Sequence, residues 1–202
     1  MKVLYQSATF TISCASPQQF PLATGPEVAF AGRSNSGKSS TLNRLCQQRK
    51  LAHVSKTPGR TQMINFFALA TGAQLVDLPG YGFAKVPERE RRKWGQLIEA
   101  YLQGRDALQG LVIVMDIRHP LTEFDWQMLA WCSDRRLPAH VLLNKADKLK
   151  RGAMQKALTS VERQLANENI EATVQVFSAA KGLGLDRLYT RLDAWLGNET
   201  ST

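Results

Sequence analysis

The sequence predicts an α/β fold of three layers, in which a mostly parallel central sheet carries helices on both faces. Short apolar segments alternate with amphipathic segments after residue 27, as expected for consecutive strands and helices. The apolar runs at 111–115 and 141–143 lack polar alternation, which is typical of parallel strands buried on both sides. A glycine-rich loop joins the apolar run at 28–31 to the first amphipathic segment, which predicts consecutive strand, loop and helix there.

The individual elements follow from apolar runs and from helical periodicity. Strands are expected at 28–31, 63–69, 74–78, 111–116, 140–144 and 173–178. Helices are expected at 38–48, 88–103, 123–135, 151–167 and 185–196. Thr122 and Asp125 resemble a capping box at the start of the third helix. We expect a single domain over 1–202 with its core at about 26–197, because the first 20 or so residues and the tail 198–202 carry little signal.

Composition excludes some classes of protein. A length of 202 residues fits one domain, and 44% hydrophobic with 21% charged residues is ordinary for a soluble globular protein. No apolar run approaches the roughly 20 residues that span a bilayer, and the N-terminus lacks a signal-peptide core, so we expect a cytoplasmic protein. The three cysteines are far apart and form no C-x-x-C, which predicts reduced thiols rather than a metal site.

The chain is strongly basic. A net charge of +9 is more than solubility requires and favours a polyanionic partner such as RNA. The alternative is a generally basic surface with a few phosphate-binding cations.

The glycine-rich loop at 32–39 matches G-x-x-x-x-G-K-[ST], the P-loop, which binds the phosphates of a nucleoside triphosphate with Mg²⁺. Glycines permit the tight turn, while the loop N–H groups and the following helix N-terminus attract anions. Lys38 is placed to reach the β- and γ-phosphates, and the Ser39 hydroxyl to ligate Mg²⁺. The alternative is a chance glycine-rich turn. The predicted phosphate-binding residues are Gly32, Arg33, Ser34, Asn35, Ser36, Gly37, Lys38 and Ser39.

A second candidate segment ends the strand expected at 74–78 and opens the loop after it. Its residues are Asp77, Leu78, Pro79 and Gly80. The Asp77 carboxylate can hold Mg²⁺ through water, and the Gly80 N–H can approach the γ-phosphate. An ordinary Asp-x-Pro-Gly turn is the alternative, but the position about forty residues after the P-loop favours the functional interpretation.

A third segment predicts which base is bound. Its residues are Asn144, Lys145, Ala146 and Asp147, followed later by Phe177, Ser178 and Ala179. The Asp147 carboxylate can accept hydrogen bonds from N1–H and the exocyclic amine of guanine, whereas adenine would leave it unpaired. The stem of Lys145 can lie along the base, and a backbone N–H of the 177–179 segment can donate to guanine O6. The segment therefore argues against an ATP-using kinase or ATPase.

Between these segments lies a loop, Lys-Thr-Pro-Gly-Arg-Thr-Gln at 56–62, whose proline and glycine predict a mobile connection. A threonine hydroxyl there could complete the Mg²⁺ shell, and spacing alone leaves Thr57 and Thr61 both open.

Together these strings resemble the EngB/YihA/YsxC family of bacterial GTPases, which belongs to the TrmE-Era-EngA-EngB-septin-like class. The resemblance covers roughly residues 20–196 and rests on the P-loop, the 56–62 loop and Asp-Leu-Pro-Gly-Tyr-Gly-Phe-Ala at 77–84. It implies a Ras-like G domain, GTP or GDP with Mg²⁺ as ligands, and Thr61 rather than Thr57 on the metal beside Ser39 and Asp77. It implies catalytic roles for Lys38, Thr61 and Gly80. Further nucleotide contacts implied are Gly59, Arg60, Thr61, Gln62 and Met63.

The resemblance also implies a role in assembly of the large ribosomal subunit, with rRNA and ribosomal proteins as partners, and an association with cell division and septation. We expect a monomer that does not bind membranes. The alternative is a GTP-gated RNA- or ribosome-binding module with negligible intrinsic turnover.

Three further features are informative. Tyr81 stands where many small GTPases carry a water-orienting glutamine, which predicts slow intrinsic hydrolysis unless another group or a partner orders the water. The alternative is that Tyr81 simply packs in the core. Asn35 could bind K⁺ beside the phosphates, or simply tolerate the loop's backbone angles. The basic residues 89, 91, 92 and 93 open the helix after Tyr81 and are either an rRNA contact or a solvated face.

Overall fold

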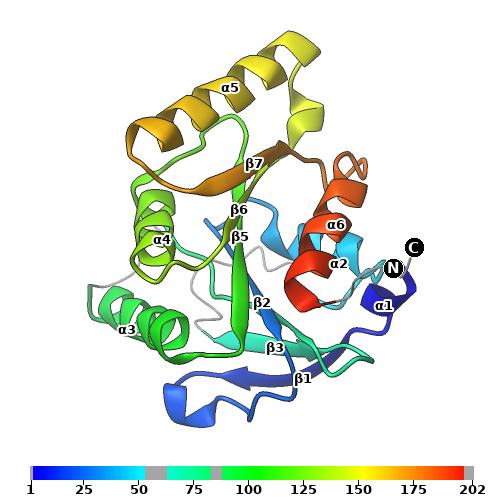
Figure 1. Ribbon diagram of the computed structural model, residues 1–202, viewed down its shortest axis with the longest axis vertical. Coiled ribbons are helices and arrows are strands. Elements are labelled where there is room, and N and C mark those ends of the chain that lie inside the picture. Colours follow the sequence, from blue (N-terminus) through cyan, green and yellow to red (C-terminus); the bar gives the residue numbers. More distant parts are fainter. Residues whose placement is uncertain (1, 53–62, 83–87, 198–202) are drawn as a thin grey trace.

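A seven-stranded sheet organises the computed structural model, which describes residues 2–52, 63–82 and 88–197 (Figure 1). The strand order is β1-β3-β4-β2-β5-β6-β7. The strands are β1 (Thr9–Cys14), β2 (Glu27–Gly32), β3 (Ile64–Ala68), β4 (Gln74–Asp77), β5 (Leu108–Asp116), β6 (Ala139–Asn144) and β7 (Ala172–Val176). From β4 to β7 all neighbours are parallel, while β3 pairs antiparallel with both β4 and β1. The predicted, mostly parallel α/β sheet is confirmed.

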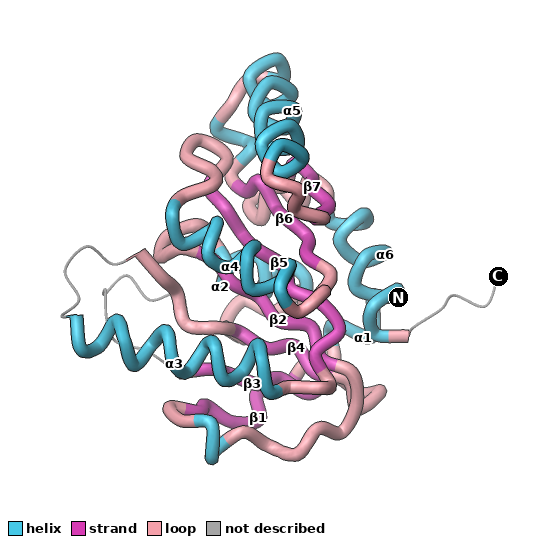
Figure 2. Tube along the Cα trace, turned by 60° about the vertical axis from the view of Figure 1, so that its left-hand side comes forward, coloured by secondary structure: helices cyan, strands magenta, loops and turns pink. Residues whose placement is uncertain are grey.

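Helices cover both faces of this sheet (Figure 2). They are α1 (Lys2–Gln6), α2 (Lys38–Leu45), α3 (Glu88–Gly104), α4 (Glu123–Asp134), α5 (Arg151–Asn167) and α6 (Leu185–Leu196), with 3₁₀ turns η1 (Pro17–Gln19) and η2 (Ala146–Lys148). Apolar residues of α3, α4 and α5 join one buried cluster, and those of α1, α2 and α6 join the other. The three-layer arrangement follows from these two cores.

The central strands contribute side chains to both cores, because successive side chains of a strand point to opposite faces of the sheet. On β5, Leu111, Ile113 and Met115 belong to the cluster under α3, α4 and α5. Val112 and Val114 belong to the cluster under α2 and α6. This explains why the 111–115 run has no polar alternation in the sequence.

The predicted elements shift only at their ends. The helix expected at 38–48 stops at Leu45, and Gln47 adopts a left-handed backbone with φ of 52°, which no α-helix continues through. Thr122 and Asp125 form the predicted capping box at α4, where Thr122 N–H donates to Asp125 Oδ2 at 2.8 Å. Among the described residues, no helix is both long and apolar enough to cross a membrane.

The N-terminal segment contains structure that was not predicted. Strand β1 forms an edge of the sheet, and its side chains are mostly exposed. Helix α1 is anchored by Tyr5, whose hydroxyl donates to Asp193 Oδ1 of α6 at 2.7 Å. The Tyr5 ring also lies 5.1 Å from that of Tyr189. The alternation of Phe10, Ile12 and Cys14 with polar residues was the signal available for β1.

Candidate functional site

The motif residues meet at one edge of the sheet because β2, β4, β6 and β7 run in the same direction. The P-loop leaves the carboxyl end of β2, and Asp77 is the last residue of β4. Asn144 is the last residue of β6, and Ser178 lies just beyond β7. Open parallel sheets bind ligands in the crevice outside these carboxyl ends.

The P-loop has little room for side chains at its two glycines. A Cβ on Gly32 would lie 2.7 Å from both Ser36 Oγ and the Val114 carbonyl oxygen. A Cβ on Gly37 would lie 2.2 Å from Asn144 Nδ2, and Gly37 has a φ of 98°. Asn35 also has a left-handed backbone, with φ of 66°, as expected of a residue that tolerates this conformation. The loop geometry therefore depends on both glycines.

Lys38 opens helix α2 and points toward the end of β4, where its ammonium group pairs with the Asp77 carboxylate. Both side chains are buried, with only 10% of each exposed. Asn65 Nδ2 lies 3.4 Å from the other oxygen of Asp77. The structure thus brings together the predicted phosphate-binding cation and the predicted Mg²⁺-supporting carboxylate.

One polar atom inside the loop lacks a partner among the described residues. The Ser36 hydroxyl is buried, and no hydrogen bond is made by its Oγ there. Buried polar groups are normally hydrogen-bonded, and an exception needs an explanation. A phosphate oxygen would accept from this hydroxyl, and the Lys38 ammonium group at the end of the same loop supplies the positive charge that a phosphate requires. The residues present therefore fit a nucleotide phosphate with its Mg²⁺.

The segment after Asp77 is joined to the P-loop through its backbone. Ser34 N–H donates to the Tyr81 carbonyl at 2.8 Å, and Tyr81 N–H approaches the Gly32 carbonyl at 3.4 Å. A Cβ on Gly80 would lie 3.6 Å from Ser34 N, so Gly80 lies directly beside the loop. The predicted γ-phosphate sensor and the P-loop are therefore neighbours.

The Tyr81 side chain points away from this loop into the core, where 2% of the residue is exposed. Its hydroxyl donates to Asp125 Oδ1 at 2.6 Å, and its ring packs against those of Trp94 and Phe124. Burial, together with the Asp125 carboxylate, raises the pKa of Tyr81 well above its ordinary value. These contacts support the packing interpretation of Tyr81 over a role in orienting water.

The base-reading segments are joined to the P-loop by Asn144. Its Nδ2 donates to the Ser36 carbonyl at 2.8 Å, and its Oδ1 accepts from Ala179 N–H at 3.1 Å. Ala146 N–H donates to the Phe177 carbonyl at 3.1 Å. One amide thus links the phosphate loop to both of the segments predicted to surround the base.

Lys145 and Asp147 come directly after the end of the same strand, β6. Lys145 has a φ of 63°, and its ammonium group donates to the Asn35 carbonyl of the P-loop. The Asp147 carboxylate accepts from Ser178 Oγ at 2.6 Å. This hydrogen bond lowers the pKa of Asp147 below its ordinary value, so the carboxylate is ionised at neutral pH and available as an acceptor.

Comparison with known proteins decides the family. A model described as "50S ribosome-binding GTPase" matches residues 27–145. The probable GTP-binding protein EngB of Vibrio parahaemolyticus is 50% identical over 195 residues, which is 96% of this chain and 89% of that protein. Its namesake in Escherichia coli O139:H28 is 51% identical over 191 residues, covering 95% and 91% of the two chains. The chain belongs to the EngB family of GTP-binding proteins.

Solved structures agree with the fold of this EngB-family chain. The crystal structure of a probable GTP-binding protein engB superposes with a TM-score of 0.68 at 22% identity, covering 86% of this chain and all of that one. Era of Aquifex aeolicus gives a TM-score of 0.67 at 21% identity, covering 86% and 57%. The predicted Ras-like G-domain architecture is therefore confirmed, and the chain is a member of a GTPase family.

Several predicted site residues of this EngB-family chain lie outside the described residues. They are Thr57, Gly59, Arg60, Thr61 and Gln62. Met63 is described and immediately precedes β3. The roles assigned to Thr61 and its neighbours remain predictions.

Two residues at the site were missed by motif reasoning. Arg44 of α2 donates from Nε to the Ala179 carbonyl and from Nη2 to the Ala180 carbonyl, both at 2.7 Å. Nothing in the sequence around Arg44 marks this contact with a segment 135 residues away. Asp116 ends β5 beside Asn144 and pairs with Lys145. An acid at the carboxyl end of an expected parallel strand was the available signal for Asp116.

Proposed function

We propose that this protein is a molecular switch that binds and hydrolyses GTP and acts in assembly of the large ribosomal subunit, in a cytoplasmic, monomeric form. The observation that carries this proposal is the convergence of the P-loop, the Asp77 segment and the Asn144 segment at one edge of the sheet. The matched family description adds the ribosomal subunit as the partner class. The role in cell division and septation that the family resemblance implies is part of this proposal.

At the phosphate end, Lys38 and the N–H groups of residues 32–39 hold the β- and γ-phosphates. Mg²⁺ supplies positive charge that neutralises the phosphate oxygens as the leaving group departs. Ser39 and Thr61 would ligate it, and Asp77 would support it through water. Asn35, inside the same loop, would offer an oxygen ligand to K⁺ beside the phosphates.

Asn35 gives the K⁺ part of this proposal a direct test. GTP turnover is measured in K⁺ and in Na⁺ buffers of equal ionic strength, with Asn35→Ala as a second protein. Faster turnover in K⁺ that is lost in the variant supports the ion site. Equal turnover in both buffers would remove K⁺ from the mechanism.

At the base end, Asp147 accepts from guanine N1–H and the exocyclic amine while Ser178 holds its carboxylate in place. The Lys145 stem lies along the face of the base, and a backbone N–H of residues 177–179 donates to O6. Adenine offers an acceptor at N1 and lacks the amine, so the Asp147 carboxylate would be left unpaired. A competition assay checks this assignment: ATP that displaces labelled GDP as well as GTP does would overturn it.

Hydrolysis by this arrangement depends on positioning and charge stabilisation. The Tyr81 hydroxyl is committed to Asp125 in the core and does not reach the loop. We therefore expect slow intrinsic turnover that the ribosomal partner accelerates. The same observation favours the second candidate, a GTP-gated binding module with negligible turnover. Single-turnover hydrolysis with and without large subunits separates the two, because only the first predicts acceleration.

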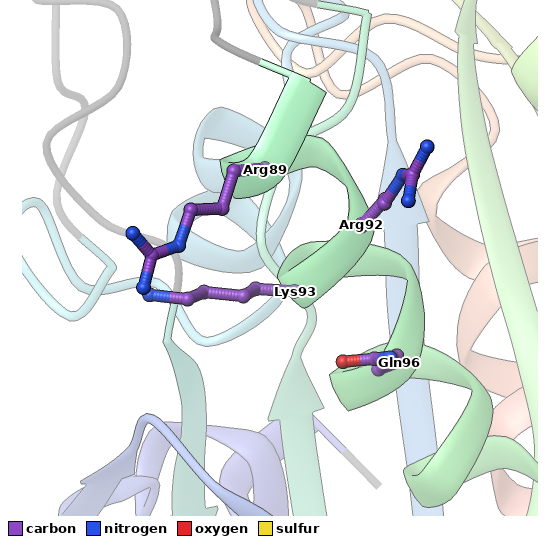
Figure 3. A pocket seen from close by; sticks show the side chains of 4 residues that line it. All are labelled: Arg89, Arg92, Lys93 and Gln96. Carbon is purple, nitrogen blue, oxygen red and sulfur yellow. The ribbon is translucent and has the colours of Figure 1, made fainter.

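The contact with rRNA is proposed on helix α3. Arg89, Arg92, Lys93 and Gln96 line a surface hollow of about 360 Å³ (Figure 3). Arg89 and Lys93 extend on the same side of the helix, and Arg92 extends from another side. Three cations around one hollow suit a phosphodiester backbone, which binds through charge and without sequence preference.

The decisive experiment is sedimentation with large ribosomal subunits. The protein is loaded with GDP or with a non-hydrolysable GTP analogue, and pelleting is compared at several salt concentrations. We expect pelleting to depend on the nucleotide. Equal pelleting in both states, or none in either, would contradict the switch.

Charge reversal on α3 locates the contact. Arg89→Glu with Arg92→Glu should weaken pelleting and flatten its salt dependence, because fewer counterions are released. The matched control is Arg151→Glu with Lys156→Glu on exposed positions of α5. An unchanged salt slope for the α3 variant would remove this face from the interface.

A further inference from the structure

Asp116 lies outside the recognised motifs but touches the centre of the site. It is the last residue of β5 and stands opposite Asn144 in the parallel register with β6. Ile117 N–H donates to the Asn144 carbonyl at 2.9 Å, so the backbone pairing continues past the end of the strand. Asp116 therefore lies beside the residue that precedes Lys145.

The Asp116 carboxylate is held from two sides. Arg118 donates from Nε to Oδ1 at 2.9 Å and from Nη2 to Oδ2 at 2.6 Å, and its backbone N–H also reaches Oδ1 at 3.1 Å. The Lys145 ammonium group lies 3.0 Å from Oδ2. Because 17% of the Asp116 side chain and 28% of the Lys145 side chain are exposed, solvent screens this pair only in part.

The Lys145 ammonium group is thus held between two acceptors, Asp116 Oδ2 and the Asn35 carbonyl of the P-loop. A lysine side chain has a flexible four-carbon stem, and ordering it costs conformational entropy. Two acceptors at its tip fix the course of the stem before any ligand arrives. Preorganisation of this kind raises the affinity for a ligand, because the entropy of ordering the lysine side chain is not lost again when the ligand binds.

We propose that Asp116 is a positioning residue for guanine recognition, which holds the Lys145 side chain across the base site. The inference rests on the proposed function, since it takes the Lys145 stem to contact the base. Asp116 itself does not touch the nucleotide. It acts through Lys145, and Lys145 in turn fixes the Asn35 turn of the P-loop.

The charge of Asp116 is maintained over the working range of pH. The hydrogen bonds from Arg118, with Lys145 beside it, hold the pKa of the Asp116 carboxyl well below its ordinary value. Asparagine at this position would keep the shape but would offer Lys145 only a neutral amide oxygen. Asp116→Asn is therefore the substitution that removes the ion pair with the least change in volume.

The test measures affinity for GDP and IDP, the latter lacking the exocyclic amine that Asp147 reads. Asp116→Asn should weaken both by roughly threefold to tenfold, as expected for a partly exposed, charge-assisted contact. The ratio of the two affinities should stay constant, since Asp147 is untouched. The control is Asp106→Asn, an exposed acid 3.7 Å from Arg135, which should change neither affinity.

A double-mutant cycle with Lys145→Met isolates the mechanism. If Asp116 acts through Lys145, then Asp116→Asn has no further effect once the ammonium group is gone. An equal loss in both backgrounds, or a shift in the GDP-to-IDP ratio, would overturn the inference. So would an affinity in Asp116→Asn equal to that of the parent protein.

Two controls separate this inference from other failures. A parent protein that binds no guanine nucleotide refutes the proposed function, whereas a parent that binds GDP alongside an unaffected Asp116→Asn refutes only the positioning role. Thermal unfolding without nucleotide checks that the variant is folded. If it is not, Asp116→Glu keeps the charge, displaces the carboxylate by one methylene and should give the same uniform loss.

Discussion

The two ends of the candidate site are built differently. At the base end, the side chains of Asn144, Lys145, Asp147 and Ser178 all hydrogen-bond to other described residues. At the phosphate end, the Lys38–Asp77 pair is buried and the Ser36 hydroxyl has no partner among the described residues. The base end is therefore preassembled, whereas the phosphate end keeps buried polar groups whose interactions a ligand would complete.

This difference predicts different consequences of substitution. At the base end the charged side chains of Lys145 and Asp147 are partly exposed, so water replaces much of a contact that is removed there. A buried charge that loses its counter-charge has no such compensation. Substitutions of the phosphate-end pair should therefore affect both stability and binding, and those of Lys145 and Asp147 mainly binding.

The largest effect is expected from Lys38→Met. It removes the phosphate-binding ammonium group and leaves the buried Asp77 carboxylate without its cation, which costs about 3 kcal/mol of unfolding free energy. Urea unfolding measures the stability, and GTP titration should show that binding is lost. The double variant Lys38→Met with Asp77→Asn should recover most of the stability and none of the binding. If the double variant does not recover stability, the loss of stability in Lys38→Met is not caused by the unpaired Asp77 carboxylate.

Gly37→Ala should have the next largest effect, because it damages the connection between the two ends. The new Cβ would lie 2.2 Å from Asn144 Nδ2, at a φ of 98° that alanine avoids. Backbone strain plus the lost Asn144 bonds should weaken GDP binding by about 100-fold. Gly152→Ala on α5, with nothing within 4 Å of its Cβ, is the matched control and should leave binding intact. Similar affinities for the two variants would refute the role of Asn144 as the link.

The sequence could predict those parts of the two ends that depend on local patterns and on strand direction. The strand, loop and helix around residues 32–39 follow from glycine geometry and an apolar run, and the structure confirms them. The order of Asp77, Asn144 and Ser178 places them on one edge because parallel strands share a direction.

What the sequence could not predict depends on contacts between distant segments. Arg44 and Asp116 became part of the site only through partners that folding brings near. Tyr5 is held by a hydrogen bond to Asp193, 188 residues away, so the local sequence around α1 does not explain its position. Strand β1 is an exposed edge whose short alternation resembles many loops. The end of α2 shifted because a positive φ at Gln47 is not encoded by apolar periodicity.

A smaller effect is expected from Tyr81→Phe, which tests whether the residue after Gly80 belongs to the core or to the chemistry. The loss of the 2.6 Å hydrogen bond leaves Asp125 Oδ1 unsatisfied and should lower the unfolding free energy by about 1–2 kcal/mol. GTP turnover should stay within roughly twofold, since backbone atoms, not the hydroxyl, join Tyr81 to the P-loop. A large fall in turnover with unchanged stability would move Tyr81 into the catalytic machinery.

The smallest effect is expected from Ser178→Ala at the preassembled base end. At neutral pH the affinity for GDP should fall by roughly twofold to fivefold, because Asp147 loses one donor but stays ionised. The pH dependence is more informative. The Ser178 hydroxyl lowers the pKa of Asp147, so its removal lets that pKa rise toward the ordinary value.

Guanine binding needs the ionised carboxylate and is lost as pH falls through the pKa of Asp147. In Ser178→Ala the loss should therefore begin at a higher pH than in the parent protein, within a range of roughly pH 3 to 5. GDP titrations across that range, with the exposed Ser133→Ala as control, measure the displacement. Coincident pH profiles for Ser178→Ala and the parent protein would show that Ser178 does not tune Asp147, and the base end would then owe its order to Asn144 and Lys145 alone.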